Sequence, residues 1–467
     1  MTKQSNCILR AGVLALAVGA ALPSHAAGEA KNVIFFLGDG MGPTTVTATR
    51  IYKAGETGQL TMESLKRTAR IKTYSNDAQT TDSAPSMAAY MTGVKMNNEV
   101  ISMSADTKAF DASGKPYLAA NGVDTTCAAG NGTPVATLLE LAKGAGKAVG
   151  AVTTTRITHA TPAITFSHIC NRDGENQIAQ QGTPGNALYN AALKDGVDVL
   201  LGGGRRHFLP QGTTGSVRTD ANDLIAQFQA ANYTYVSTGT QLAAVNPATT
   251  NKLLGLFTMS HMAYNLDRVQ NNLDQPSLAD MTEKAVRILQ KNGNGYFLMV
   301  EGGRIDHALH ETNAKRALED TVAFDEAIKR ALSLVDLSNT LIVVTADHDH
   351  TMTINGYSHR GNPILGLTTN TRTKQPQLAA DGLPFTTLVF GNGGNARNSV
   401  RDNPALVDTT AADYHQDVGV QRAGGVGNET HGGGDVMLFS GGPGSAPLKG
   451  TMVNTNVFGV VKSAMGL

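Results

Sequence analysis

Short runs of β-branched and aromatic residues alternate with amphipathic stretches along most of this 467-residue chain. Residues 32–37 (Asn-Val-Ile-Phe-Phe-Leu) form such a run, and 296–300 and 340–345 have the same character. Stretches 276–291 and 311–334 carry apolar residues at helical spacing. Uninterrupted apolar runs are typical of strands that helices cover on both faces. The alternation therefore predicts a doubly wound α/β fold with a mostly parallel central sheet and helices on both faces.

Two segments interrupt this alternation. Residues 205–250 are polar and rich in turn-forming residues, and 365–430 contain the glycine-rich sequence 391–395. We expect 365–430 to be a loop-rich insertion in the C-terminal third, on the outside of the sheet. An ordinary long loop system would give the same pattern, so the sequence leaves both interpretations open. The segment 27–467 as a whole is expected to form one domain.

The N-terminus has the composition of a secretory signal. Lys3 and Arg10 precede and flank an apolar stretch, 11–22, and Ala26 ends a small-residue cleavage motif. This stretch is too short to span a bilayer, and no later segment has the roughly 18 uninterrupted apolar residues that a membrane helix needs. We expect residues 1–26 to be removed and the protein to be periplasmic or secreted.

The charge balance and the cysteine content narrow the range of functions that this chain can have. The 38 Lys and Arg residues balance 38 Asp and Glu residues, so no overall field attracts nucleic acid or an anionic membrane. Cys127 and Cys170 would be the two cysteines of the mature chain. In an oxidising compartment they are candidates for one disulfide, and two separate buried thiols are the alternative. Neither has a metal-binding spacing, which disfavours thiol catalysis and zinc fingers.

Acidic and histidine residues follow three of the expected strands. The three sequences concerned are GDGMG at 38–42, EGGRID at 301–306 and ADHDH at 346–350. Ligand sites of open parallel sheets form where the strands end, and glycine allows a ligand to approach the backbone closely. One Asp after a strand is usually a turn or helix cap, but three such ends with histidines indicate a metal cluster. Carboxylate and imidazole ligands suit Zn²⁺, and an all-oxygen set suits Mg²⁺.

Ser83 lies near the expected start of another helix. A helix N-terminus offers unpaired N–H groups and a positive dipole end, which suit a phosphoryl oxygen. Asp82 or Ser83 could also serve only as an N-cap. No G-x-S-x-G elbow surrounds Ser83. As a nucleophile, Ser83 would therefore need a metal that lowers its pKa.

Six motifs together resemble those of the alkaline phosphatases. They are DGMG at 39–42, TDSA at 81–84, VTTTRITHATP at 152–162, VEGGRIDHALH at 300–310, TADHDH at 345–350 and ETHGGGD at 429–435. The resemblance implies hydrolysis of phosphate monoesters to alcohol and inorganic phosphate, with broad specificity, an alkaline optimum and a phosphoserine intermediate on Ser83. Phosphate would be product and inhibitor. The resemblance also implies a homodimer and a crown-like role for the insertion.

The resemblance assigns a role to individual residues. Arg172 would bind the phosphate. Two Zn²⁺ and one Mg²⁺ per subunit are implied: one Zn²⁺ on Asp306, His310 and His431, the other on Asp39, Asp347 and His348, and Mg²⁺ on Asp39, Thr161 and Glu301. His159 and His307 stand where enterobacterial members carry Asp and Lys and where animal members carry His. We expect both histidines to lie behind the direct ligands, in a site closer to the animal-type branch.

Three other functions remain possible. Residues 83–86 (Ser-Ala-Pro-Ser) also resemble the start of the sulfatase signature, but Met87 stands where that signature needs Arg. A phosphodiesterase or a metal-dependent phosphomutase of the same superfamily is the second alternative. The third is a non-catalytic phosphate-binding protein, which would need Arg172 but neither Ser83 nor three metals.

Overall fold

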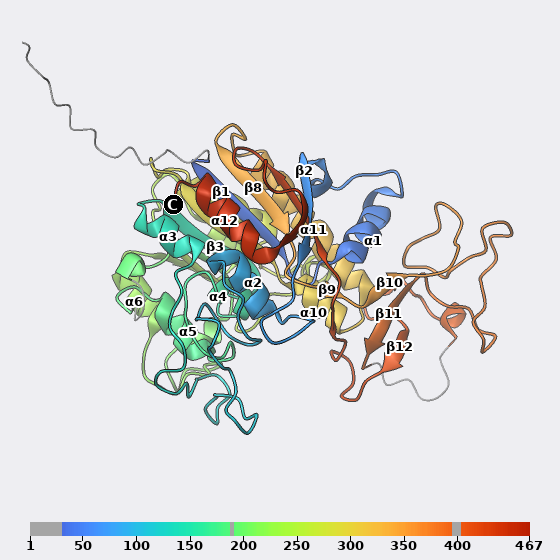
Figure 1. The fold of residues 1–467 in the computed structure, drawn as a ribbon, viewed down its shortest axis with the longest axis horizontal. Coiled ribbons are helices and arrows are strands. Elements are labelled where there is room, and N and C mark those ends of the chain that lie inside the picture. Colours follow the sequence, from blue (N-terminus) through green and yellow to red (C-terminus); the bar gives the residue numbers. More distant parts are fainter. Residues whose placement is uncertain (1–29, 187–190, 395–402) are drawn as a thin grey trace, which may run out of the picture.

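A 10-stranded sheet runs through the molecule, in the order β15-β2-β14-β8-β1-β7-β3-β4-β6-β5 (Figure 1). The computed structural model describes residues 30–186, 191–394 and 403–467, so the expected signal segment lies outside the described residues. The strands of this sheet are β1 (Asn32–Gly38), β2 (Arg67–Lys72), β3 (Ala148–Arg156), β4 (Val199–Gly203), β5 (Thr234–Val236), β6 (Leu253–Leu256), β7 (Tyr296–Gly302), β8 (Thr340–Thr345), β14 (Val436–Gly441) and β15 (Gly450–Val453). β14 is antiparallel to both neighbours, and the other neighbouring pairs are parallel. The predicted mostly parallel sheet is confirmed.

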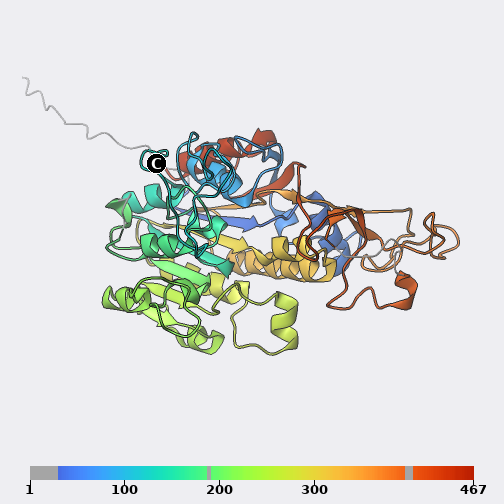
Figure 2. The ribbon, with the colours of Figure 1, turned by 90° about the horizontal axis from the view of Figure 1, so that it is seen from below.

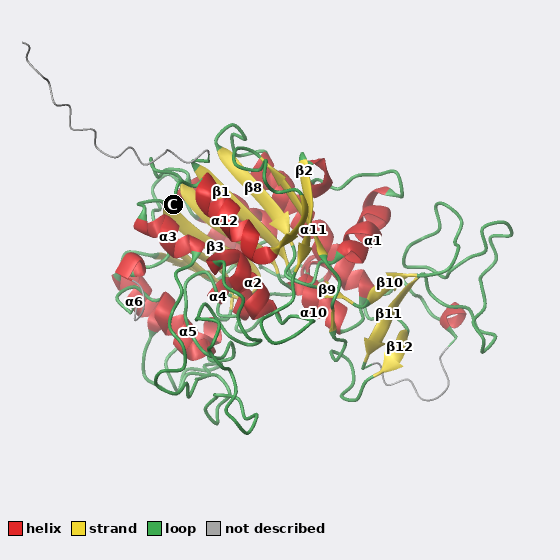
Figure 3. Ribbon diagram, viewed as in Figure 1, coloured by secondary structure: helices red, strands yellow, loops and turns green. Residues whose placement is uncertain are grey.

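Helices cover both faces of this sheet, which Figures 2 and 3 show from two sides. One face carries α2 (Ser83–Thr92), α3 (Leu138–Gly144) and α12 (Asn454–Ala464), and the other carries α1 (Pro43–Ala54), α9 (Leu278–Leu289) and α11 (Ala314–Leu332). The shorter helices are α4 (Ala160–Ala163), α5 (Glu175–Gly182), α6 (Leu224–Ala230), α7 (Gly239–Ala244), α8 (Asn265–Gln270) and α10 (Arg304–His310). The doubly wound arrangement is confirmed. Among the described residues, no helix has the length and apolar character to cross a membrane.

The central strands end at a common edge of the sheet. Every residue of β7 and β8 is buried, as the apolar runs predicted. In the parallel register, Leu37 of β1 lies beside Glu301 on one side and Thr345 on the other, and Thr153 of β3 is also paired with Glu301. The segments that follow β1, β7 and β8 therefore start from neighbouring points, which brings their polar residues together.

One predicted helix and one predicted turn-rich segment differ from what the sequence indicated. The helix expected at 311–334 is observed as α11, Ala314–Leu332, which starts later because Thr312 has a positive φ of 55° and Asn313 caps α11 by accepting from Arg316 N–H. The segment 205–250 is not all turns, since it contains α6, β5 and α7. Asp223 is the N-cap of α6, and Thr238 is the N-cap of α7.

Residues 352–394 and 403–430 form a second region beyond one end of the main sheet (Figure 1). Its strands β10 (Met352–Ile354), β11 (Leu388–Gly393) and β12 (Val418–Gln421) make a 3-stranded sheet. Most of the remaining described part of this region is loop. A separate two-stranded pair, β9 (Asp349–His350) with β13 (His431–Gly432), aligns His431 with His350.

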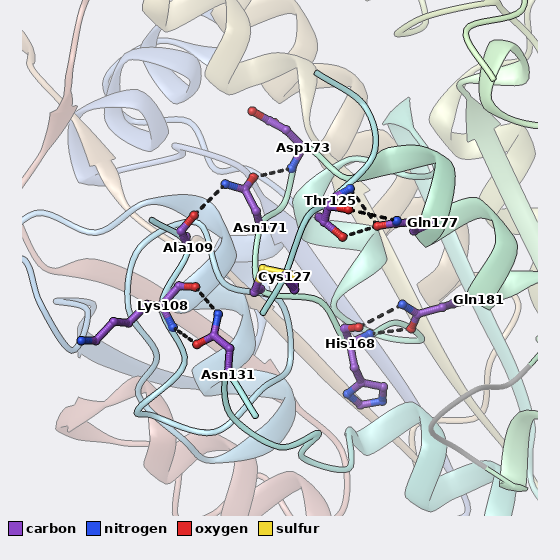
Figure 4. Close-up of a disulfide and its surroundings, with 11 residues drawn as sticks. Lys108, Ala109, Thr125, Cys127, Asn131, His168, Asn171, Asp173, Gln177 and Gln181 are labelled. Carbon is purple, nitrogen blue, oxygen red and sulfur yellow. Dashed lines mark hydrogen bonds between the residues drawn. A yellow bond between two sulfur atoms is a disulfide. The ribbon is translucent and has the colours of Figure 1, made fainter. Parts of the chain in front are cut away.

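Cys127 and Cys170 form a disulfide, with a Cα–Cα distance of 6.0 Å (Figure 4). The alternative of two separate thiols is wrong. Amide side chains secure the same region: Gln181 binds both the N–H and the C=O of His168, and Gln177 accepts from the Thr125 N–H. The disulfide therefore fastens the loop that precedes α3 to the segment that precedes α5.

Removal of this disulfide is expected to destabilise the fold. The two cysteines are 43 residues apart in sequence, and a loop of that length corresponds to about 4 kcal/mol in the chain-entropy description. The variant Cys127→Ser/Cys170→Ser should lose roughly 2–5 kcal/mol in a denaturant titration. Reduced wild-type protein is the control and should lose a similar amount. Two free thiols in the denatured, unreduced mature protein would contradict the bond.

Candidate active site

Ser83 is the first residue of α2, as its sequence predicted. Asp82 caps this helix, and its Oδ2 accepts the Ala84 N–H at 3.3 Å. Ser83 is only 2% exposed, and its Oγ lies 3.2 Å from His348 Nε2 and 3.4 Å from Asp39 Oδ1. The hydroxyl thus meets residues from the ends of β1 and β8 at the positive end of a helix dipole.

Asp39, Asp347 and His348 come together next to Ser83. His348 Nε2 lies 3.3 Å from Asp39 Oδ1 and 3.5 Å from Asp347 Oδ2. Asp347 Oδ1 accepts the N–H groups of Gly40 and His348, each at 3.0 Å, whereas its buried Oδ2 has no hydrogen-bond partner among the described residues. Burial and the Asp39 charge raise the pKa of Asp347 well above its usual range. A cation would relieve this repulsion.

A second group gathers around Asp306. Its Oδ1 lies 3.3 Å from His310 Nε2, 3.6 Å from His431 Nε2 and 2.7 Å from His350 Nε2. His310 and His431 bring their Nε2 atoms to 3.2 Å from each other. α10 places Asp306 and His310 one turn apart, and β13 supplies His431. The predicted set Asp306, His310 and His431 is therefore assembled, and His350 lies against Asp306 beside it.

The histidines of both groups have the orientation of metal ligands. Nδ1 of His310 lies 2.6 Å from the Glu429 carbonyl oxygen, and Nδ1 of His431 lies 2.8 Å from the Thr81 carbonyl oxygen. His348 Nδ1 similarly lies 3.1 Å from the carbonyl of residue 349. A carbonyl oxygen can only accept, so each Nδ1 carries a hydrogen, and in the neutral ring the lone pair is then on Nε2. Because these Nε2 atoms face carboxylates, the donor sets fit divalent cations such as Zn²⁺.

Asp39, Thr161 and Glu301 form an oxygen-rich pocket. Thr161 Oγ1 lies 3.5 Å from Asp39 Oδ2. Glu301 Oε2 accepts from the hydroxyl of Thr153, but the buried Oε1 has no hydrogen-bond partner among the described residues. Burial and the Asp39 charge raise the pKa of Glu301 well above its usual range. An unpartnered carboxylate oxygen beside a second carboxylate fits a hard cation such as Mg²⁺. A ring nitrogen of His159 lies within 4.8 Å of both carboxylates.

Arg172 lies beside the nucleophile. Its Nη1 donates to Asp82 Oδ1, and its Nη2 lies 3.0 Å from His159 Nε2. Asp82 thus connects α2 and the guanidinium. This arrangement holds Arg172 next to Ser83, where a planar fork of N–H donors suits two phosphate oxygens.

Sequence reasoning missed two buried residues of this site, His350 and Glu429. His350 lies between two carboxylates, 2.7 Å from Asp306 Oδ1 and 2.5 Å from Glu429 Oε2. Glu429 Oε1 also accepts the Thr351 N–H at 2.7 Å. Such a chain of carboxylate, imidazole and carboxylate orients a metal ligand. Both residues lie inside motifs that the sequence singled out, TADHDH and ETHGGGD, and that was the available signal.

His159 and His307 meet a third histidine, His261, which no sequence motif indicated. The ring centroids of His261 lie 5.2 Å from His159 and 4.3 Å from His307. Each ring also faces a guanidinium: His159 faces that of Arg172, His261 that of Arg156 and His307 that of Arg304. Metal-bound histidines need acceptors, not cationic donors, at their second nitrogen. These rings therefore differ from the ligand sets above in that each faces a cation, although the buried Nδ1 of His159 has no hydrogen-bond partner among the described residues. Burial and Arg304 lower the pKa of His307 to about 3, so that ring is neutral.

Comparisons with known proteins agree with this geometry. The family model described as alkaline phosphatase matches residues 30–467. The tissue-nonspecific alkaline phosphatase of Rattus norvegicus is 40% identical over 447 residues, which cover 89% of this chain and 79% of that protein. The alkaline phosphatase of Gadus morhua is 38% identical, with 89% and 87% covered.

Solved bacterial structures share the fold. The alkaline phosphatase of Thermus thermophilus matches with a TM-score of 0.67 and 26% identity, over 98% of this chain and 96% of that chain. The enzyme of the Antarctic bacterium TAB5 matches with a TM-score of 0.65 and 23% identity, over 93% and 98%. The higher identity to the animal enzymes agrees with the animal-type motifs at the site. Family match, identity and fold together lead to one conclusion: this chain belongs to the alkaline phosphatase family.

Proposed function

We propose that this chain hydrolyses phosphate monoesters to an alcohol and inorganic phosphate through a phosphoserine on Ser83. The observation that supports this most directly is the position of the Ser83 hydroxyl. It lies at the N-terminus of α2, 3.2 Å from His348 Nε2 and 3.4 Å from Asp39 Oδ1. A nucleophile, a carboxylate–imidazole set and an arginine around one point are the parts that phosphoryl transfer needs.

The metals that this metal-dependent family implies are two Zn²⁺ and one Mg²⁺ per subunit. We assign one Zn²⁺ to Asp306, His310 and His431, the other to Asp39, Asp347 and His348, and Mg²⁺ to Asp39, Thr161 and Glu301. Divalent cations in such sites lower the pKa of a nearby hydroxyl and neutralise charge on the attacking and leaving oxygens.

The protein's own residues supply position and charge. Ser83 Oγ loses its proton to solvent and attacks the phosphorus in line, which breaks the bond to the leaving oxygen and forms phosphoserine. The leaving oxygen takes a proton from water and departs as the alcohol. Arg172 binds two non-bridging oxygens of the phosphoryl group, and the first N–H groups of α2 add a positive field. Water then attacks the phosphoserine, releases inorganic phosphate and restores the Ser83 hydroxyl. Phosphate can rebind at Arg172 and so inhibit.

The site recognises a terminal phosphate and little of the leaving group, so we expect broad specificity and an alkaline optimum. A panel of p-nitrophenyl phosphate, bis(p-nitrophenyl) phosphate and p-nitrophenyl sulfate tests this. Turnover of the monoester should exceed the other two by several orders of magnitude. Preference for the diester or the sulfate would favour another enzyme of the superfamily, and phosphate binding without any turnover would favour a binding protein.

Arg172→Ala should lower turnover of the monoester by roughly 10²–10³-fold, as the loss of one transition-state hydrogen-bond donor does. It should also raise the inhibition constant of inorganic phosphate, because the guanidinium binds product as well. Initial rates with phosphate as the added inhibitor measure both effects. An unchanged inhibition constant would contradict the role of Arg172.

His159→Asp should tighten Mg²⁺ binding at the oxygen-rich pocket. His159 contributes a nitrogen near Asp39 and Glu301, which favours Zn²⁺ or Co²⁺ over Mg²⁺. The parent enzyme should therefore be activated by added Mg²⁺ and inhibited by excess Zn²⁺, and the variant should need less added Mg²⁺. His159→Asn is the uncharged control. Identical Mg²⁺ activation curves for parent and variant would show that residue 159 does not tune this pocket.

We also propose a periplasmic or secreted homodimer in which 27–467 is one catalytic domain and 365–430 is a crown-like insertion at the dimer contact. The signal-like N-terminus and the disulfide support export. Exposed apolar side chains support the contact, namely those of Tyr357, Leu378, Leu406 and Val420, in or beside the insertion. The balanced charge supports small phosphate esters, not nucleic acid, as partners. Analytical ultracentrifugation measures the oligomeric state.

A further inference from the structure

Glu99 has an unusual backbone conformation beside the phosphate-binding arginine. Its φ is 71°, in the left-handed region that residues other than glycine rarely adopt. In this conformation its N–H donates to Asp82 Oδ2 at 3.1 Å, and its C=O accepts the main-chain N–H of Arg172 at 2.8 Å. Asp82 Oδ1 binds the Arg172 guanidinium in turn. Asp82, Glu99 and Arg172 thus form a closed ring of hydrogen bonds directly next to Ser83.

Strained backbone of this kind persists only where the surrounding structure enforces it, and it is concentrated at functional sites. Here the enforcing contacts are the two that Glu99 makes with Asp82 and Arg172. Asp82 is also the N-cap of α2, the helix that begins at Ser83. The conformation of Glu99 therefore affects the position of Ser83 and that of the Arg172 guanidinium together.

The Glu99 side chain adds negative charge to the surroundings of Arg172. Asp82, Glu99 and Asp173 all act electrostatically on this guanidinium. Burial, followed by the charges of Asp82, Asp173 and Asp77, raises the pKa of Glu99 to about 7, although Arg172 opposes the shift. A group with this pKa is mainly neutral below neutral pH and ionised under alkaline conditions.

We propose that Glu99 is a positioning residue that sets how strongly Arg172 holds phosphate: its backbone holds the main chain of Arg172 and the Asp82 carboxylate that binds the guanidinium, and its own carboxylate opposes the anionic product. The inference rests on the proposed role of Arg172. It follows that phosphate leaves more readily as the pH rises, because ionised Glu99 repels the phosphate dianion while Arg172 keeps its charge.

Glu99→Gln tests the charge without changing the size of the side chain. At about pH 9, inorganic phosphate should inhibit the variant at roughly threefold to tenfold lower concentration than the wild type, as expected for the loss of one nearby charge. At about pH 6 the two inhibition constants should agree within roughly twofold, because Glu99 is then neutral in the wild type. A purely structural role would not produce a difference that depends on pH.

Glu99→Gly removes the whole side chain while keeping the backbone conformation, since glycine adopts the left-handed region without strain. Like Glu99→Gln, this variant should be inhibited more strongly by inorganic phosphate than the wild type at alkaline pH. Its thermal unfolding midpoint shows whether it is folded. Asn272→Gly is the matched control, because Asn272 is also left-handed, with φ 48°, but lies in the turn after α8. It should leave phosphate inhibition unchanged.

The outcomes separate this inference from the proposed function. If Glu99→Gln follows the wild type at both pH values while Arg172→Ala weakens phosphate inhibition, the role of Glu99 is overturned and that of Arg172 stands. If Arg172→Ala also leaves phosphate inhibition unchanged, both roles are overturned.

Discussion

Ser83→Ala is expected to lower turnover of p-nitrophenyl phosphate by roughly four to six orders of magnitude, as removal of a covalent nucleophile does. In the proposed reaction the Ser83 hydroxyl attacks the phosphorus from the N-terminus of α2, and alanine leaves Asp39 and His348 in place. Bound Zn²⁺ and Mg²⁺ should therefore stay at wild-type stoichiometry. Turnover, metal content and trapping of a labelled phosphoenzyme at acidic pH measure the three parts of this expectation.

Thr92→Ala is the matched control for Ser83→Ala. It removes a hydroxyl from the other end of α2, where Thr92 Oγ1 donates to the Ala88 carbonyl at 2.7 Å. Turnover should stay within about threefold of wild type, since the change removes only this bond and the one that Thr92 Oγ1 accepts from the Val94 N–H, both of them at the far end of the helix. A phosphoenzyme that still forms in Ser83→Ala, on another residue, would refute the assignment of the nucleophile.

Asp306→Asn is expected to lose the metal of the histidine-rich site and to lower turnover by roughly three orders of magnitude or more. Asp306 Oδ1 lies within 3.6 Å of the Nε2 atoms of His310, His350 and His431. An amide has similar size but no charge, so it neither balances a dication nor pairs with these rings. Metal content after dialysis, measured beside turnover, separates loss of metal from loss of chemistry.

Asp320→Asn is the control for a buried aspartate outside the site. Asp320 is 5% exposed against 4% for Asp306, and its carboxylate accepts only the Asn265 N–H among the hydrogen bonds resolved in the described residues. Burial raises the pKa of Asp320 to about 7, so a neutral amide is a close substitute. This variant should keep its metals and its turnover. Full metal retention in Asp306→Asn would exclude Asp306 as a ligand.

Much of the site could be predicted because the chemistry follows directly after buried strands. β1, β7 and β8 were recognisable as apolar runs, and the parallel register brings their ends to one edge of the sheet. Asp39, Asp306 and Asp347 were predicted to meet for that reason, and in the structure they do. The start of α2 was equally local, because Asp82 caps a helix whose first residue is Ser83.

Other features could not be predicted, because they depend on which distant segments pair. Glu429 is 79 residues from His350, and only the pairing of β9 with β13 brings that part of the chain against His350. His261 follows β6 without any motif, yet the fold packs its ring edge-to-face against those of His159 and His307. A sequence gives no distance between such side chains.

By itself, therefore, the sequence determined the class of fold, the family and the residues that follow the central strands, because alternating apolar runs and short-range caps act within a few residues. Only the tertiary structure decided which polar atoms find no partner within the described residues, such as Glu301 Oε1, and which residues act through others, such as His350. The same holds for the left-handed backbone of Glu99. Its conformation is enforced by contacts with Asp82 and Arg172, which exist only once the separate segments have packed together.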